Sequence, residues 1–161
     1  MPAWLENGVY FNQSKAIMRK LAKKYGYESS DHIVNWRIDS VIDEAPDHFE
    51  KFYGVVSKRQ FDDEALKKFL DVVKGFSGFV ERIIDSFGSN TYIADRKISA
   101  ADFAVAGLVF TYIFNDAFAG GSKWTSAAQE VVMASPKFCA WVNLMRTELG
   151  GYLKTRKPSP M

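Results

Sequence analysis

The sequence predicts a mainly α-helical protein that opens with a single β-hairpin. Apolar residues recur at helical spacing through most of the chain after its first dozen residues. Near the start, Asn7-Gly8 separates two short apolar runs, and this dipeptide favours a two-residue hairpin turn because both positions need positive φ. Ser99 and Asp102 precede a long apolar run at the spacing of a helix capping box. With 161 residues, of which 47% are apolar, the chain can bury one substantial core.

The first two helices follow the hairpin directly. Residues 12–25 place apolar side chains on one face, and Gly26 is the expected C-cap. Ser29 or Ser30 is expected to cap the second helix, whose apolar stripe reaches Phe52. Pro46 lies within that stripe and predicts a bend or a break.

Four further helices are expected in the rest of the chain. One starts at residues 62–64, where three acidic side chains suit the helix dipole, and ends near Gly88. Gly75 and Gly78 weaken the prediction that it is unbroken. The helix after Ser99 is apolar nearly all round, as expected of a helix surrounded by others. Residues 122–134 and 136–149 predict two more, and Gly150-Gly151 is expected to end the last.

The capping box is interpreted as a structural device rather than a catalytic one. The Ser99 hydroxyl can accept the N–H of Asp102, and the Asp102 carboxylate can accept the N–H of Ser99. Ile98 before the box and Phe103 after it can pack together as a hydrophobic staple. These four residues would fix how the chain enters a buried helix.

The capping box, the N-terminal segment and the C-terminal segment together resemble the glutathione S-transferase family, in a sigma-like form. The N-terminal segment reads Met1-Pro2-Ala3-Trp4 and continues to Gln13-Ser14-Lys15-Ala16-Ile17. The C-terminal segment has Ser135-Pro136 opening a helix that contains Trp141, followed by residues 152–156. The resemblance covers nearly the whole chain. It implies an all-α glutathione S-transferase C-terminal-like bundle over residues 28–161, preceded at residues 1–27 by a β-β-α remnant of a thioredoxin-like domain.

The resemblance also implies where glutathione would bind. In the family, a Gln-Ser pair at the start of the helix after the hairpin holds the γ-glutamyl carboxylate, and Gln13 and Ser14 occupy those positions. The alternative is that Ser14 only caps the helix. The family's cis-proline and the residue before it contact the cysteinyl part of glutathione, which implies Pro2 and Met1. In the family, an aspartate reaches the glutathione amino group across a dimer interface, and the resemblance implies that role for Asp43.

The remaining titratable residues do not predict a metal or catalytic site. Asp39, Asp43 and Asp47 share one helix face if the helix is unbroken. Some sigma-like members of the family hold a divalent ion there, but a solvated acidic face is the favoured interpretation, and no metal site is predicted. His32 and His48 lack metal-ligand spacing and are interpreted as surface residues.

Composition excludes several classes of protein. With 21 basic and 19 acidic residues, the net charge of +2 predicts no binding to nucleic acid. The longest apolar run, residues 103–114, is too short to span a membrane. The sequence has one cysteine, Cys139, so an intrachain disulfide is excluded. We interpret Cys139 as a small buried apolar residue. With no secretory leader at the start, a cytoplasmic or other reducing intracellular location is expected.

The resemblance leaves two functions open. Family members begin with β-α-β-α-β-β-α, and this chain starts at the fifth of those elements, without the Tyr, Ser or Cys that activates the glutathione thiol. We therefore expect no catalytic residue and no cofactor, and the resemblance implies glutathione as the ligand. The first function is a non-catalytic binding or scaffold subunit, with a protein partner or a second copy covering the hairpin. The alternative is a portion of an active glutathione S-transferase that conjugates glutathione to electrophiles.

Overall fold

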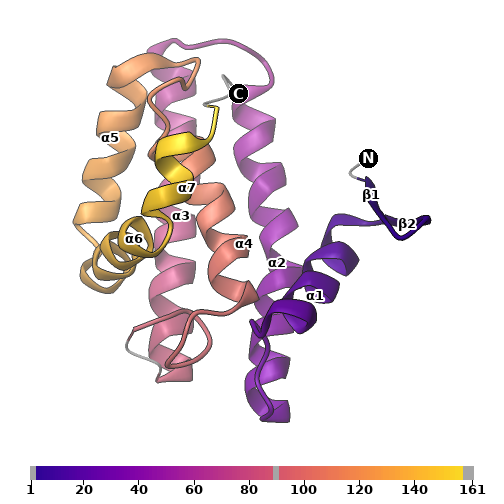
Figure 1. The fold of residues 1–161 in the computed structure, drawn as a ribbon. Helices are drawn as coiled ribbons and strands as arrows, with labels where there is room; N and C mark the ends of the chain where they lie inside the picture. Colours follow the sequence, from indigo (N-terminus) through magenta and orange to yellow (C-terminus); the bar gives the residue numbers. More distant parts are fainter. Residues whose placement is uncertain (1–2, 89–90, 158–161) are drawn as a thin grey trace.

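Helices α2 to α7 form a bundle around the short central helix α4, and the hairpin with α1 projects from one side of it (Figure 1). The computed structural model describes residues 3–88 and 91–157. Its elements are β1 Ala3–Glu6, β2 Val9–Asn12, α1 Ser14–Tyr25, α2 His32–Val56, α3 Asp63–Phe87, α4 Ala100–Leu108, η1 Val109–Ile113, α5 Gly121–Met133, α6 Pro136–Glu148 and α7 Gly150–Thr155. The predicted fold class, mainly helical with an N-terminal hairpin, is confirmed. The division at residue 27, and the interpretation of the first part as a thioredoxin-fold remnant, stay predictions.

The hairpin has two different faces. Asn7 and Gly8 take φ of 51° and 78°, as the predicted turn requires, and the register pairs Trp4 with Phe11 and Leu5 with Tyr10. The Trp4–Phe11 face lies toward α1, because the Lys20 ammonium sits 4.5 Å from the centroid of the Phe11 ring. Leu5 and Tyr10 therefore lie on the outer face, where they are 56% and 77% exposed.

Glu6 fastens the hairpin to α1. Its carboxylate pairs with the ammonium groups of Lys20 and Lys24, one turn apart on the helix. The hydrogen bond from Lys20, followed by that from Lys24, lowers the pKa of Glu6 to about 2. Below that pH the Glu6 carboxylate becomes protonated, and its ion pairs with Lys20 and Lys24 are lost.

Helix α2 corrects two expectations, the break at Pro46 and the N-cap. It runs unbroken from His32 to Val56 with Pro46 inside it, so the break does not occur, and the alternative of a bend stays a prediction. The proline removes one helical hydrogen bond, but the turns on both sides bury apolar side chains, which hold the helix together. Asp31 is the N-cap in place of Ser29 or Ser30, and its carboxylate accepts the N–H groups of Ile33 and Val34.

The C-terminal end adds a helix that was not predicted. Helix α6 ends at Glu148, just before the two glycines as expected, but Gly150 and Gly151 begin a further short helix, α7. Leu153 of α7 packs against the core, and the Arg156 guanidinium donates to the carbonyl of Phe110 at 2.8 Å. These tertiary contacts outweigh the low helix propensity of glycine.

The N-terminus of α4 is the polar centre of the core. Ser99 and Asp102 form a capping box, in which Asp102 Oδ2 accepts the Ser99 N–H and the Ser99 hydroxyl, both at 2.9 Å. Asp102 Oδ1 accepts the Ile93 N–H at 2.9 Å and Trp141 Nε1 at 2.8 Å. One buried carboxylate thus joins the α3–α4 loop, α4 and α6.

Two residues are placed differently from their predicted surroundings. His48 is buried, at 5% exposure, between the rings of Phe76 and Phe79. Cys139 is half-buried rather than buried. His48 lies on the core side of α2, so the surface interpretation is wrong.

Within the described residues, no helix is long and apolar enough to cross a bilayer.

Candidate functional site

The start of α1 is the candidate binding site that the sequence predicts. Gln13 precedes the helix with φ 67° and ψ 105°, a left-handed conformation that costs a non-glycine residue about 1–3 kcal/mol. Ser14 is the first helical residue, and within the described chain no side chain caps this helix. The first helical hydrogen bond runs from Ile17 N–H to the Gln13 carbonyl. The preceding N–H groups are therefore open to an anion at the positive end of the helix dipole.

An apolar groove lies on each side of α1. The first, of about 440 Å³, is lined mainly by apolar side chains, among them Trp4, Leu21, Tyr25 and Tyr27. The second, of about 630 Å³, lies between α1, α2 and α4 and includes Ile42, Phe49, Leu108 and Tyr112. Ser14, Met18 and Phe103 line both grooves. The helix start with its open N–H groups therefore stands between two apolar recesses.

The second groove has open space beside Gly107, and among the described residues the Tyr112 hydroxyl in it has no hydrogen-bond partner. Gly107 is exposed although α4 is otherwise mostly buried, and a Cβ at that position would meet nothing within 4 Å. The Tyr112 hydroxyl is buried and has no hydrogen-bond partner among the described residues. Burial raises the pKa of Tyr112 to about 12, so its hydroxyl stays protonated and able to donate.

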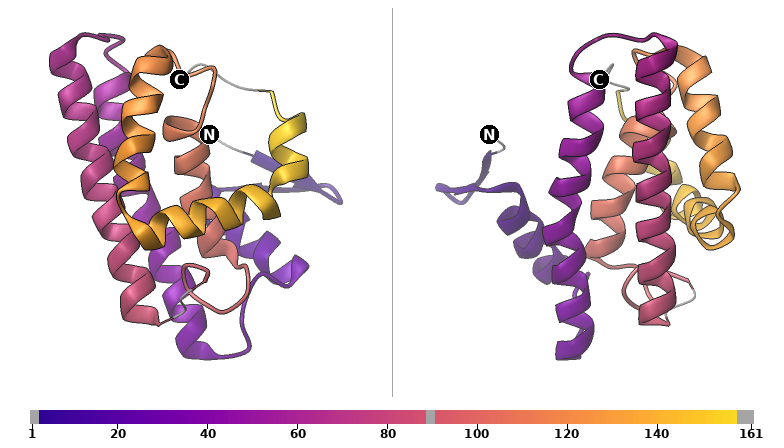
Figure 2. Two further views of the ribbon diagram at one scale, coloured as in Figure 1. Left: turned by 90° about the vertical axis from the view of Figure 1, so that its left-hand side faces the viewer. Right: turned by 180° about the vertical axis from the view of Figure 1, so that it is seen from behind.

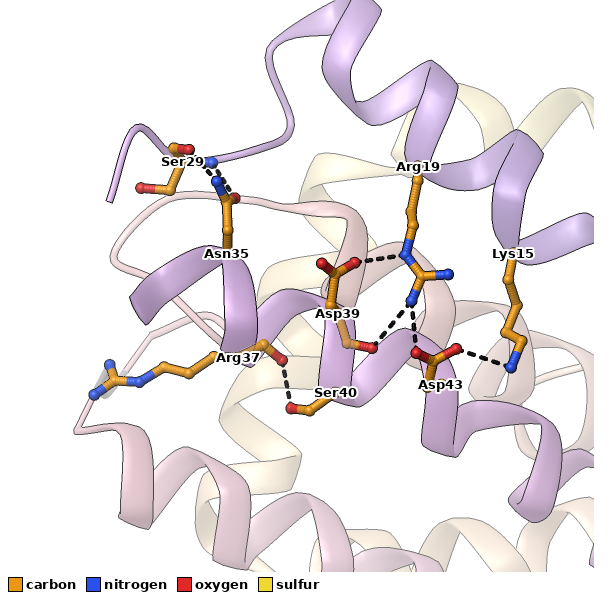
Figure 3. A network of polar contacts seen from close by, with 8 residues as sticks. All are labelled: Lys15, Arg19, Ser29, Asn35, Arg37, Asp39, Ser40 and Asp43. Atoms are coloured by element: carbon orange, nitrogen blue, oxygen red, sulfur yellow. Dashed lines mark hydrogen bonds and ion pairs between the residues drawn. The ribbon is translucent and has the colours of Figure 1, made fainter. Parts of the chain in front are cut away.

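Figure 3 shows that Asp39 and Asp43 pair with α1 of the same chain. Arg19 Nε lies 2.6 Å from Asp39 Oδ1, and Arg19 Nη2 lies 2.7 Å from Asp43 Oδ2. Lys15 Nζ lies 2.8 Å from Asp43 Oδ1. The hydrogen bond from Lys15 leads in lowering the pKa of Asp43, with Arg19 adding to it.

The pairing changes what Asp43 can do. Both of its oxygens already bind cations, so contact with a glutathione amino group would require at least one of these pairs to open. Its implied role stays a prediction. Asp47 adds no third ligand, since the described residues contain no group of three His, Cys, Asp or Glu side chains able to hold a metal ion.

Of the other predicted site residues, Phe103 lines both grooves beside Ser14, and the rest are committed elsewhere or lie outside the described residues. Met1 and Pro2 lie outside the described residues. Ser99 and Asp102 are committed to the α4 capping box, and Phe103 packs edge-on against Tyr27, with ring centroids 4.8 Å apart.

Sequence reasoning missed the pairing of α1 with α2, although its signal was present. Lys15 and Arg19 stand four apart on one helix, and Asp39 and Asp43 stand four apart on the next. Side chains of opposite charge at the same spacing on two consecutive helices predict ion pairs between those helices. The unpartnered Tyr112 hydroxyl had no comparable signal, because it depends on packing.

Comparison of this chain with known proteins finds relatives among the glutathione S-transferases. No family model matches the chain. The glutathione S-transferase 3 of Caenorhabditis elegans is 24% identical over 150 residues, which cover 88% of this chain and 72% of that protein. The solved structure of Na-GST-3, a monomeric glutathione S-transferase from the hookworm Necator americanus, has a TM-score of 0.78 at 20% identity and covers 100% of this chain and 76% of its own. The glutathione S-transferase Blo t 8 has a TM-score of 0.71 at 16% identity, over 100% of this chain and 72% of that one.

These matches define the fold class of the chain. Its hairpin, α1 and helical bundle share the fold of 76% of the Na-GST-3 chain and 72% of the Blo t 8 chain. The sequence relative and the solved structures to which this chain is similar are all glutathione S-transferases, and the solved structures show that this chain shares their fold. The sigma-like subtype stays a prediction.

Proposed function

We propose that these 161 residues act as a glutathione-transferase-like binding module, a scaffold subunit that joins a partner polypeptide and does not conjugate glutathione by itself. The observation that carries this proposal is the apolar surface presented by the hairpin and by both sides of α1. Leu5, Val9 and Tyr10 are 56%, 53% and 77% exposed. Covering such surface is favourable by about 25 cal/mol per Å² of apolar area.

The backbone of the hairpin offers a second means of joining a partner. Among the described residues, β1 and β2 form a sheet of two strands, so each strand has an edge with unpaired N–H and C=O groups. A two-stranded sheet is marginal by itself. A strand added to this edge would satisfy those groups and cover the outer face at the same time.

The side chains around Ser14 argue against thiol activation by these residues. Lowering the pKa of a thiol requires a nearby cation, a general base or a directed hydrogen-bond donor. Of the described residues that line the two grooves, Lys15 alone carries a charge, and it is paired with Asp43. The grooves can therefore hold apolar groups. Their described lining offers neutral hydroxyl donors, among them Ser14 and Tyr112, but no unpaired cation and no general base that would take up a thiol proton.

A second function is favoured by one specific observation, the strained backbone of Gln13 beside Ser14. Strain of this kind persists where the surrounding structure holds it, and it is concentrated at binding sites. In this alternative, the chain is a portion of an active glutathione S-transferase. The carboxylate of glutathione would bind the open N–H groups of α1, and the 630 Å³ groove would receive an apolar electrophile.

A conjugation assay separates the two functions. The isolated chain is incubated with glutathione and a generic electrophile, and the rate is measured against protein concentration. Under our proposal the rate stays at the uncatalysed background. A rate that rises with protein concentration, is lost in Ser14→Ala and is kept in the matched control Ser122→Ala would overturn the proposal in favour of the transferase.

Hydrogen exchange tests the partner directly. The amides of residues 4–11 are compared in the isolated chain and in the chain within its native extract. Protection only in the extract is the expected result, because a partner strand would bond to the open edge. We place the assembly in the cytoplasm or another reducing compartment, in keeping with a single half-buried cysteine.

A further inference from the structure

A polar recess on the bundle, separate from α1 and its grooves, contains two arginines. It has a volume of about 290 Å³ and lies between η1, α5, α6 and α7. The polar side chains that line it are Asn115, Asp116, Gln129, Arg146 and Arg156. Small-molecule sites commonly combine such a recess with a few converging polar groups, and this volume suits a small metabolite.

A π-helical turn shapes the floor of the recess. In η1, the Phe114 N–H bonds to the carbonyl of Val109 at 2.9 Å, one residue beyond the usual helical partner. The last carbonyls of this helix bond to side chains instead. Arg156 Nη2 donates to Phe110 at 2.8 Å, and Gln129 Nε2 donates to Ile113 at 3.1 Å.

These bonds orient the lining side chains before any ligand arrives. Asn115 is 4% exposed and donates to the Thr111 carbonyl at 3.1 Å. The Arg146 guanidinium lies 4.3 Å from the centroid of the Phe114 ring, a cation–π contact that holds it over the recess. Side chains fixed in this way lose little freedom on binding, so less of the binding free energy is offset.

The side chains that line the recess carry a net positive charge. Within the part of the chain that the structure describes, neither Arg146 nor Arg156 takes part in an ion pair. Asp116 is the one carboxylate among the described lining residues, and it is exposed at the rim. Two guanidinium groups against one carboxylate leave a net positive charge, and the helix carbonyls of Phe110 and Ile113 beside it already accept hydrogen bonds from Arg156 and Gln129.

We propose that this recess binds a small molecule carrying a carboxylate or phosphate group. The planar fork of a guanidinium matches the two oxygens of either group. Arg146 and Arg156 would bind the anion, and Asp116 would accept a hydroxyl or ammonium group of the same ligand. The inference is independent of the function proposed for the hairpin and α1.

A titration of the intact chain tests the site. Inorganic phosphate and succinate are added separately at constant ionic strength set with chloride, and the arginine Nε–H resonances and the amides of residues 114–116 are followed by NMR. Saturable shifts with at least one of the two anions are expected. Which of the two saturates tells whether phosphate or carboxylate is the preferred group. Linear shifts with both, equal to those caused by chloride, would overturn the proposal.

Three variants identify the residues responsible. Arg146→Gln leaves every backbone hydrogen bond in place and should weaken binding about tenfold or more, because a charge-assisted pair is lost. Arg156→Lys keeps the charge near the Phe110 carbonyl but loses the fork, and it should also bind more weakly. Lys154→Gln removes the same charge from the exposed side of α7 and should bind within about twofold of the parent. Unchanged binding by Arg146→Gln, or an equal loss in Lys154→Gln, would show that the recess is not the site.

Discussion

Asp102 does more than its place in a capping box requires. A capping-box carboxylate satisfies one N–H group of its own helix, whereas Asp102 also binds Ile93 of the preceding loop and Trp141 of α6. Burial raises the pKa of Asp102, although the donors around it act in the opposite direction. The side chain is fully buried, so removing it leaves several donors without an acceptor.

Asp102→Ala should therefore lower the free energy of unfolding by about 3 kcal/mol or more, since each orphaned buried donor costs about 1–3 kcal/mol. Chemical denaturation monitored by tryptophan fluorescence measures the change, and Trp141 itself reports on the site. Asp71→Ala, an exposed carboxylate of α3, is the control and should change stability by less than about 0.5 kcal/mol. Similar losses in the two variants would contradict the role assigned to Asp102.

His48 makes stability depend on pH. Burial is the main cause that lowers the pKa of His48 from 6.5 to about 4, and the nearby charge of Lys51 adds to it. The unfolded chain therefore binds the proton more readily than the folded one. This contribution to stability is complete above pH 6.5 and is lost as the pH falls from 6.5 towards 4, by about 3 kcal/mol at most.

Thermal melts between pH 7 and pH 4 test this contribution. The wild-type chain and His32→Gln, which changes an exposed histidine, should lose stability over this interval. His48→Phe keeps an aromatic ring between Phe76 and Phe79 and should lose less. A parallel decline in all three proteins would assign the pH dependence to other groups.

At the scale of single elements, helix ends are held by residues from other helices as well as by their own caps. Ser135 precedes α6 without a side-chain cap. Instead, Glu81 Oε1 of α3 accepts the N–H groups of Lys137 and Phe138, both at 2.9 Å. A carboxylate at this position also suits the positive end of the helix dipole.

Glu81→Ala should destabilise the protein by about 1–2 kcal/mol, the usual cost of losing a helix cap. Glu81→Gln keeps an acceptor and should cost less. Glu130→Ala changes an exposed glutamate of α5 and is the matched control. If urea denaturation gives the same midpoint for Glu81→Ala and Glu130→Ala, the hydrogen bonds of Glu81 to the start of α6 do not contribute to stability.

Local signals predicted those elements whose ends depend on local chemistry. The Asn7-Gly8 turn, the Gly26 and Gly88 helix ends and the start of α3 all follow from conformational preferences within a few residues. Local signals fell short where tertiary contacts decide. They did not predict α7, which depends on the contact of Arg156 with Phe110, and they left open a break in α2, which the core beneath that helix prevents.

The candidate site could be predicted only in part, for a related reason. Gln13 and Ser14 are adjacent in sequence, so one motif placed them at the helix start. The grooves beside α1 and the Arg146–Arg156 recess combine residues from elements far apart in the chain. Their chemistry emerges from packing, which a pattern along the sequence does not contain.

For the molecule as a whole, the hairpin projects away from the bundle while α1 lies beside α2, as the right-hand view in Figure 2 shows. They are joined to it near the start of α4, where the Tyr27 carbonyl accepts the Ala100 N–H at 3.1 Å. The ion pairs of Lys15 and Arg19 with α2 add a second attachment. The outer face of the hairpin points away from both attachments, and its large apolar side chains meet solvent.

The isolated chain should therefore self-associate through this outer face when no partner covers it. Tyr10→Lys places a charge at the centre of the face and should shift the protein towards the monomer, because a buried ammonium without a partner is costly and charged edges resist strand pairing. Tyr152→Lys makes the same change at a tyrosine of α7 that is 62% exposed, and it should leave the association unchanged. Sedimentation at several concentrations measures the distribution of species for each protein. If the parent chain is a monomer at high concentration, or if Tyr152→Lys dissociates it as well as Tyr10→Lys does, the hairpin is not the interaction surface and the binding-module proposal loses its main support.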